Sequence, residues 1–156
     1  MPPQVVPVPS QVVPVPSQVV AVRALARAAR ILERVSCPLT LAHYRVLCAI
    51  EAGDERASRV AERLAMGKPA VSAAVDALCQ RGWLVRAGVG DDLRATALSV
   101  TGTGRDVLRS AEETMAGWLS ELCARTADPA GTVAALAGLA GALDQLSAER
   151  HGGARR

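Results

Sequence analysis

The sequence predicts a mainly α-helical fold with one small β-hairpin, and three observations lead to that prediction. Hydrophobic residues recur at helical spacing through most of the chain after residue 20. Two β-rich runs, 83–87 and 95–100, are separated by a loop at 88–94 that contains Gly and Asp. Two short helical patterns joined by a tight turn come directly before this hairpin.

The chain begins with a repeat that cannot build a core. "QVVPVPS" occupies residues 4–10 and again 11–17, and "QVV" follows. Proline at alternate positions favours extended, polyproline-like geometry and prevents a continuous apolar helix, which argues against a signal or membrane segment. We expect residues 1–19 to be a disordered tail. A proline-rich recognition ligand is the alternative, although the repeat lacks a PxxP core and flanking charges.

This tail gives a first prediction. A chain that starts at Gln18 should keep the melting temperature and the ligand affinities of the full chain, because uncharged proline-rich heptads bury no surface. Thermal unfolding of the two chains side by side measures the first of these. A large fall in the melting temperature would reveal a docking site for the tail.

The first helix is predicted at 20–36. One stripe of this segment is charged and the other is apolar, and Pro38 follows it. The charged stripe holds Arg23, Arg27, Arg30 and Arg34, and the apolar stripe holds Leu25, Ala28, Leu32 and Val35. A solvated face behind a packing face explains this pattern, and we expect the packing face, with Leu25 and Leu32, to contribute to a dimer.

Three shorter helices have clear start and stop signals. Thr40 can cap a helix that Gly53 ends, and a short helix at about 57–65 follows. Gly67 can then cap a helix at about 68–81, with Pro69 in its first turn. Two helices joined by a turn and followed by a hairpin make a winged helix-turn-helix, which we place at 37–104.

Two long helices complete the chain. In the first, after Thr101, and in the second, which Asp128 and Pro129 begin, leucines and other apolar residues step by three and four. These residues are Leu108, Ala111, Met115, Trp118 and Leu122, then Leu136, Leu139, Leu143 and Leu146. We expect 105–150 to form C-terminal dimerisation helices and 151–156 to be a flexible basic tail.

The helix at 68–81 has one side of branched apolar residues and one of small residues. Val71, Val75 and Leu78 suit packing on the rest of the domain. The small side, formed by Ala70, Ser72, Ala73 and Ala74, can enter a major groove without steric conflict. The alternative is that these residues are only good helix formers on a solvated surface.

Composition excludes several classes of function. The net charge of +3 is too small to indicate a nucleic-acid partner by itself, and 17 of the 18 basic residues are Arg, with Lys68 the only Lys. The four cysteines form no CxxC pair and there are two histidines, so we expect no metal or cofactor. "AMGKP" lacks the residues of a phosphate loop. Ser72 has no predicted base nearby, and neither the two histidines nor the carboxylates form a catalytic set, so we expect the protein not to be an enzyme.

Three segments in order carry a family resemblance: "LTLAHYRVLCAI", "RVAERLAMGKPAVSAAVDALCQRGWLVR" and "GDDLRATALSVTGTGR". Together they resemble the MarR family of dimeric bacterial transcriptional regulators over about 20–150. The resemblance implies a winged-helix dimer that binds double-stranded DNA, with recognition helices in successive major grooves and wings in the flanking minor grooves. Carried over by position, it implies DNA contacts by Lys68, Ala70, Val71 and Ser72 of the recognition helix and by Arg94, which Asp92 positions.

The residues themselves support part of this set. An arginine at a hairpin tip suits a narrow, electronegative minor groove, and Arg59 and Arg63 can contact phosphates. Four positions depart from the family pattern: Ala65, Gly67, Ala73 and Leu93. Each departure removes a polar or charged contact, or a glycine of the turn, so we expect direct base readout to be weak.

The function expected from the sequence is therefore a cytoplasmic, homodimeric repressor that binds a pseudo-palindromic operator and is released by a small, often aromatic ligand, with no membrane partner. One alternative is a winged-helix module for protein contact without sequence-specific DNA binding. Another is a cysteine-oxidation sensor of the same fold. For that role Cys37 is the candidate, because it lies between Ser36 and Pro38 at a helix junction, whereas the other three cysteines fall on apolar helix faces.

Overall fold

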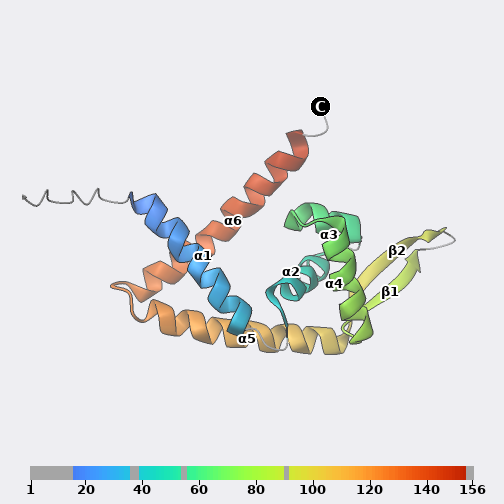
Figure 1. The fold of residues 1–156 in the computed structure, drawn as a ribbon, viewed down its shortest axis with the longest axis horizontal. Helices are drawn as coiled ribbons and strands as arrows, with labels where there is room; N and C mark the ends of the chain where they lie inside the picture. The colour runs from blue at the N-terminus through green and yellow to red at the C-terminus, as the bar shows by residue number, and fades with distance from the viewer. Residues whose placement is uncertain (1–15, 36–38, 54–55, 90–91, 154–156) are drawn as a thin grey trace, which may run out of the picture. The chain divides into compact units, whose positions relative to one another are not determined.

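The structure, a computed structural model, describes residues 16–35, 39–53, 56–89 and 92–153 (Figure 1). The predicted mainly α fold with a small hairpin is confirmed. The elements are α1 (Ser17–Val35), α2 (Leu41–Glu51), α3 (Ala57–Leu64), α4 (Lys68–Gln80), β1 (Leu84–Val89), β2 (Asp92–Val100), α5 (Gly102–Cys123) and α6 (Pro129–Gly153). The chain divides into two compact units, 1–31 and 32–156. Cys37, Pro38 and most of the two predicted tails lie outside the described residues.

The first unit contains most of α1. This helix begins at Ser17 rather than at 20, so the last residues assigned to the tail are helical. The backbone N–H groups of Val19 and Val20 donate to the carbonyl of Pro16, at 2.9 and 3.2 Å. No proline interrupts the chain between Pro16 and Pro38, which is why the helix can start directly after the repeat. Leu25 is 50% exposed in the single chain, which is consistent with the predicted contribution of this residue to a dimer.

The predicted start and stop signals of α2 and α4 are confirmed. Thr40 Oγ1 accepts a hydrogen bond from the backbone N–H of His43 at 3.1 Å, which satisfies one of the free donors of α2. Gly53 follows the end of this helix with a φ of 103°, a conformation that glycine adopts without strain. Gly67 caps α4 and Pro69 lies in its first turn. These caps fix where each helix begins, and therefore which face of α4 is buried.

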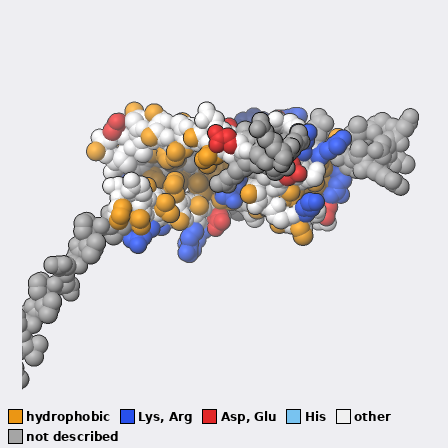
Figure 2. Space-filling view, turned by 90° about the horizontal axis from the view of Figure 1, so that it is seen from above, with side chains coloured by type: hydrophobic (Ala, Val, Ile, Leu, Met, Phe, Trp, Pro, Cys, Tyr) orange, Lys and Arg blue, Asp and Glu red, His pale blue; other side chains and the backbone are white. Residues whose placement is uncertain are grey.

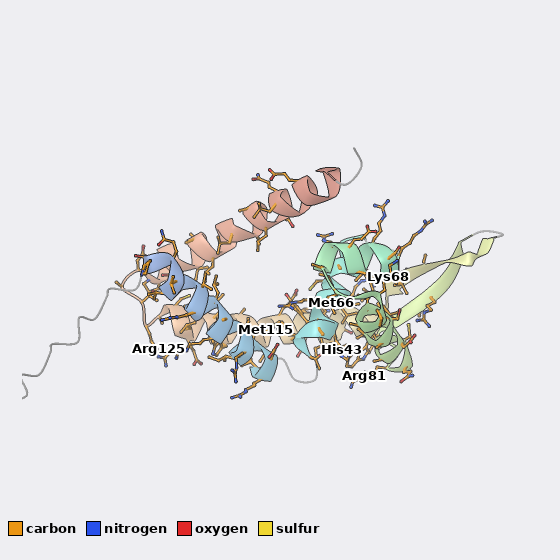
Figure 3. All side chains as sticks on the ribbon, turned by 45° about the horizontal axis from the view of Figure 1, so that its top comes forward. His43, Met66, Lys68, Arg81, Met115 and Arg125 are labelled. Carbon is orange, nitrogen blue, oxygen red and sulfur yellow. The ribbon has the colours of Figure 1, made fainter. Side chains whose placement is uncertain are left out.

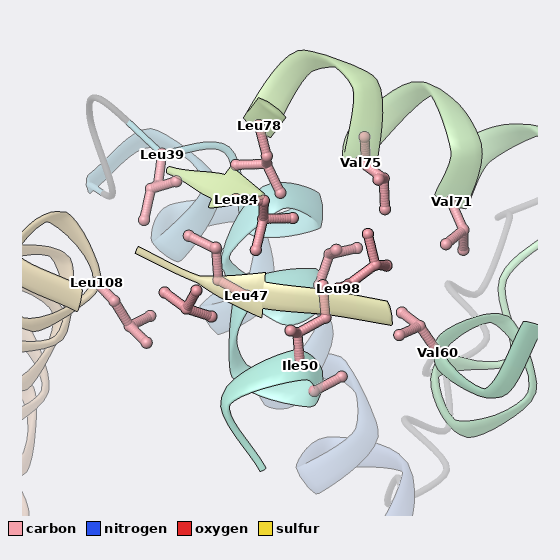
Figure 4. Close-up of a cluster of buried hydrophobic side chains, with 14 of the residues drawn as sticks. Leu39, Leu47, Ile50, Val60, Val71, Val75, Leu78, Leu84, Leu98 and Leu108 are labelled. Atoms are coloured by element: carbon pink, nitrogen blue, oxygen red, sulfur yellow. The ribbon is translucent and has the colours of Figure 1, made fainter. Parts of the chain in front are cut away.

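The core of the second unit is aliphatic and draws on every element from α2 to α5 (Figure 4). Its largest fully buried side chains are Leu39, Val46, Leu47, Val60, Val71, Val75, Leu78 and Leu84. Leucine and valine pack closely here without an aromatic side chain at the centre. Because both helices of the pair α3–α4 and both strands contribute, the core holds α4 in a fixed orientation against the hairpin.

The hairpin is longer than the sequence predicts. Strands β1 and β2 pair antiparallel from Leu84 opposite Val100 to Gly88 opposite Thr96, and the register then shifts so that Val89 lies opposite Asp92. The expected loop at 88–94 is therefore wrong: most of it is strand, and only 90–91 separates the strands. Backbone pairing continues through Gly and Asp, which have low strand propensity, because ladder hydrogen bonds do not depend on side chains. The shift is the place where extra residues of β2 are accommodated.

The junction between β2 and α5 brings two backbone segments into close contact. Thr101 caps α5 by accepting a hydrogen bond from the Gly104 N–H at 3.0 Å, and its hydroxyl donates to the carbonyl of Gly82 at 2.7 Å. A Cβ atom placed on Gly104 would lie 2.2 Å from the carbonyl oxygen of Trp83. Helix α5 is thus anchored directly on the base of the hairpin, and only glycine fits at this point.

The long helices differ in how much they bury. On α5, Leu108, Ala111 and Met115 are buried in the core, whereas Leu122 near its end is 42% exposed. Asp128 caps α6 by accepting from the Gly131 N–H at 2.9 Å, as predicted. On α6, Leu136 is half-buried, and Leu139, Leu143 and Leu146 are 46%, 61% and 50% exposed. Among the described residues, no helix has the length and apolar character to cross a membrane.

Candidate nucleic-acid interface

Helices α3 and α4 are joined by the short turn 65–67. The N–H of Ala65 donates to the Glu62 carbonyl at 3.2 Å, and the N–H of Met66 reaches back to the Ala61 carbonyl at 3.0 Å. Ala65 has a φ of 49°, the left-handed conformation that glycine usually occupies. An alanine in this region costs roughly 1 kcal/mol, so the packing of the two helices must hold the turn. The helix-turn-helix predicted from the sequence is therefore present at this place.

Helix α4 presents a narrow polar and small-residue face to solvent. Its exposed residues include Lys68, Ala70, Ser72 and Ala73, as the sequence predicts. Val71 is only 1% exposed and points into the core, so the DNA contact that the resemblance implied for Val71 is wrong (Figure 4).

Ala74 is also buried, at 6% exposure, although we expected it on the small exposed side. The helical period explains both corrections, because residues 71, 74, 75 and 78 lie on one face.

The first turn of α4 favours an anion. Gly67 provides no side-chain cap, and no acidic residue lies in the first turn. The N-terminal end of the helix therefore retains its partial positive charge, to which Lys68 adds a full charge at the same place (Figure 3). A backbone phosphate is the anion that a nucleic acid would bring to this position.

Helix α3 places its two arginines on the outer side of the pair. Arg59 and Arg63 are exposed, while Val60 and Ala61 between them are buried in the core. Several Lys and Arg side chains stand beside the hairpin end of the second unit in Figure 2. The exposure of Arg59 and Arg63 is consistent with the predicted contacts to phosphates. Those contacts stay a prediction.

The predicted wing residues lie on β2. The backbone of Asp92 begins the strand and that of Arg94 lies within the register shift, between Asp92 and Thr96, but the side chains of Asp92 and Arg94 lie outside the described part of the structure. The DNA contact assigned to Arg94 therefore stays a prediction.

An ion pair that the sequence did not indicate links β1 to α4. The guanidinium of Arg86 donates to the carboxylate of Asp76, and this hydrogen bond raises the pKa of Arg86. Asp76 lies on the exposed face of α4, where its negative charge would repel a phosphate. Arg86 offsets that charge and joins the hairpin base to the helix. Only opposite charges on neighbouring segments hinted at it, because the pair forms across the fold.

A pocket of about 420 Å³ lies within the second unit, between the last turn of α1, α2 and α5. Its walls are mostly apolar: Leu32, Leu41, Tyr44, Glu112, Met115, Ala116, Trp118 and Leu119. Burial raises the pKa of the Tyr44 phenol, and the Cys48 thiol and the Glu112 carboxylate nearby add to that rise. The phenol is therefore neutral at physiological pH.

The described cysteines are poor candidates for redox chemistry. Cys48 and Cys79 are half-buried, Cys123 is buried, and all three are free thiols. Burial raises the pKa of the Cys48 thiol, which disfavours the reactive thiolate. Cys37, the candidate from the sequence, lies outside the described residues. Within the described residues no cluster of His, Cys, Asp or Glu could hold a metal ion.

Comparison with known proteins points to one family. Residues 38–95 match the MarR family model. Apo MarR from E. coli superposes with a TM-score of 0.67 at 21% identity, over 83% of this chain and 97% of MarR. A MarR variant complexed with operator DNA has a TM-score of 0.58 at 20% identity, over 81% of this chain and 94% of that one.

A more similar sequence belongs to the PcaV transcriptional regulator from Streptomyces coelicolor, in complex with its natural ligand. It has a TM-score of 0.61 at 26% identity, over 80% of this chain and 89% of PcaV. No curated protein sequence matches the chain. Residues 38–95 therefore resemble the MarR family over the winged helix-turn-helix, and the chain has the fold of the MarR structures.

Proposed function

We propose that this protein is a dimeric transcriptional regulator that binds an inverted-repeat operator through α4 and the hairpin, represses from that site, and is released by a small ligand. The observation that carries the proposal is the first turn of α4, where a helix N-terminus without a side-chain cap and Lys68 meet on an exposed surface. A MarR variant of the same fold is complexed with operator DNA, which supports DNA binding by this chain.

Dimerisation is supported by the leucines of α6. Leu139, Leu143 and Leu146 recur at the spacing of a helix-to-helix seam and are about half exposed in the single chain. An apolar row of this length on a surface is typical of an interface. Two copies related by two-fold symmetry would place two α4 helices on one face of DNA, with half-sites about 10 bp apart.

Release by a small ligand is supported by the pocket between α2 and α5. Its volume of about 420 Å³ is in the range of small-molecule sites. Helix α2 belongs to the core that holds α4, and α5 continues beyond that core. A ligand wedged between them would change how α4 is held. PcaV, at 26% identity, is complexed with its natural ligand, which supports ligand control in this fold.

A protein-contact module is the second candidate, and Asp76 favours it. An exposed carboxylate and a small, alanine-rich face on α4 are unusual for a surface that meets phosphates. Salt distinguishes the two functions. Affinity for DNA falls steeply as salt rises because counterions are released, whereas binding to a protein partner has no such fixed slope.

One lysine substitution and one arginine substitution test the proposed DNA site. Lys68→Ala should weaken binding to a mapped operator by about 1–3 kcal/mol, chiefly at the half-site centres, because α4 has few other polar readers. Arg94→Ala should weaken binding most where A·T-rich steps flank the half-sites, since these narrow the minor groove. Fluorescence anisotropy with DNA from beside the protein's own gene, over a range of salt, measures both effects.

Arg125→Ala is the matched control. It removes the same charge from a residue beyond the end of α5 whose guanidinium donates to the Glu121 carbonyl. This variant should retain operator affinity and its salt slope. Unchanged operator affinity for both Lys68→Ala and Arg94→Ala at moderate salt would contradict DNA readout by α4 and the hairpin.

A further inference from the structure

The pocket between α2 and α5 has few polar groups among its described lining residues. Six of the eight described lining side chains are aliphatic, thioether or aromatic: Leu32, Leu41, Met115, Ala116, Trp118 and Leu119. The other two are Tyr44 and Glu112. None of the described lining residues is Arg, Lys or His. Glu112 is therefore the one charged residue among the described residues that line the pocket.

Glu112 is available to a ligand. It is exposed on α5, and it has no ion pair among the described residues. Neighbouring charges of α5 are already engaged: Arg109 pairs with Asp106, and Arg105 donates to Glu51 at 3.0 Å. A ligand that carries a positive charge would thus meet a carboxylate that no described arginine neutralises.

Tyr44 strengthens this preference. Its phenol lies close enough to Glu112 for that carboxylate to raise its pKa, after burial and the Cys48 thiol. A neutral phenol can accept a hydrogen bond from an ammonium group or donate one to the carboxylate. Trp118 adds an aromatic side chain to the lining of the pocket, and cations are attracted to the faces of aromatic rings.

We propose that this pocket selects a cationic amphiphile, a ring system that carries a protonated amine, and rejects ring systems that carry a carboxylate. The proposal rests on the proposed ligand-controlled function and adds the chemical class of the ligand. The ring lies among the leucines, Met115 and Trp118, and the ammonium group donates hydrogen bonds to Glu112 and Tyr44. An anionic ligand of the same shape loses those bonds and is repelled by Glu112.

Three probes of one shape test the charge. They are 1-naphthylmethylamine, which is cationic at neutral pH, 1-naphthalenemethanol, which is neutral, and 1-naphthoate, which is anionic. Calorimetric titration of the full chain without DNA should give an affinity for the amine at least about tenfold above that for the naphthoate, with the alcohol between them. Equal affinities, a preference for the naphthoate, or no binding of any probe would overturn the proposal.

Substitutions identify the group that discriminates. Glu112→Gln keeps the shape of the side chain and should lower affinity for the amine about tenfold, which removes most of the preference. Glu113→Gln is the matched control, because Glu113 is exposed on the same helix and does not line the pocket. Ala116→Phe should fill the pocket and abolish binding of all three probes, with thermal unfolding as the check that the variant is folded. A charge preference that survives Glu112→Gln would overturn the assignment.

Operator DNA separates this inference from the proposed function. If the amine binds with the expected preference but does not release DNA, the pocket assignment stands and ligand control fails. If the protein binds its operator while the probes bind without regard to charge, the inference fails and DNA binding stands.

Discussion

Replacing Leu139 and Leu143 of α6 by aspartate is expected to convert the protein to monomers and to abolish operator binding. The two leucines are 46% and 61% exposed in the single chain and belong to the row of α6 leucines. Burying a leucine contributes about 1.5–3 kcal/mol, and a carboxylate buried in its place adds a desolvation cost. The dimer dissociation constant should rise at least about a thousandfold, or roughly 4 kcal/mol. Sedimentation equilibrium measures this change directly.

The matched control places the same two charges on the opposite side of α6. Ala134 and Ala137 are exposed, and helical geometry turns them away from the leucine row. Ala134→Asp with Ala137→Asp should leave the dimer intact. A stable dimer of the leucine variant would place the interface on another part of the chain.

Gly104→Ala is expected to destabilise the domain by about 3 kcal/mol, because the new Cβ would lie 2.2 Å from the Trp83 carbonyl oxygen. That oxygen is backbone, and it also accepts the N–H of Thr101 at 3.0 Å, so it cannot move without breaking the hairpin junction. For a chain of this size the melting temperature should fall by roughly 6–12 °C.

Gly117→Ala gives the opposite result at a site in the same helix. A Cβ at Gly117 meets nothing within 4 Å, and alanine is favoured over glycine in a helix by about 1 kcal/mol. This variant should be slightly more stable than the parent chain. Equal melting temperatures for the two variants would show that α5 is not held against the hairpin at Gly104.

Local chemistry explains why the helix ends could be predicted. Thr40, Gly67 with Pro69, Thr101 and Asp128 act on backbone groups within one turn of themselves, so the sequence around each contains the whole cause. The exposed Lys68 and Ser72 followed from the same helical period. The burial of Ala74 follows from that period as well, and its expected exposure is wrong because small size alone does not place a residue on the outer face.

Features that join distant segments could not be predicted. The close approach at Gly104 depends on where β1 places the Trp83 carbonyl. The pair of Asp76 and Arg86 depends on how the hairpin leaves α4, and the pocket depends on Tyr44 and Glu112 meeting from helices far apart in the chain. None of these contacts produces a periodic signal, because each is set by packing of the whole domain.

The ion pair of Arg86 and Asp76 affects how far the hairpin can move relative to α4. Their side chains are 47% and 55% exposed, and an ion pair in that setting contributes only about 0.5 kcal/mol. That value is close to the thermal energy at 25 °C, so the pair is open for roughly a third of the time. The junction at Thr101 and Gly104 then holds the base of the hairpin by hydrogen bonds that do not depend on ionic strength. Raising the salt concentration should therefore broaden the range of hairpin positions relative to α4 while the helical core beneath keeps a single arrangement.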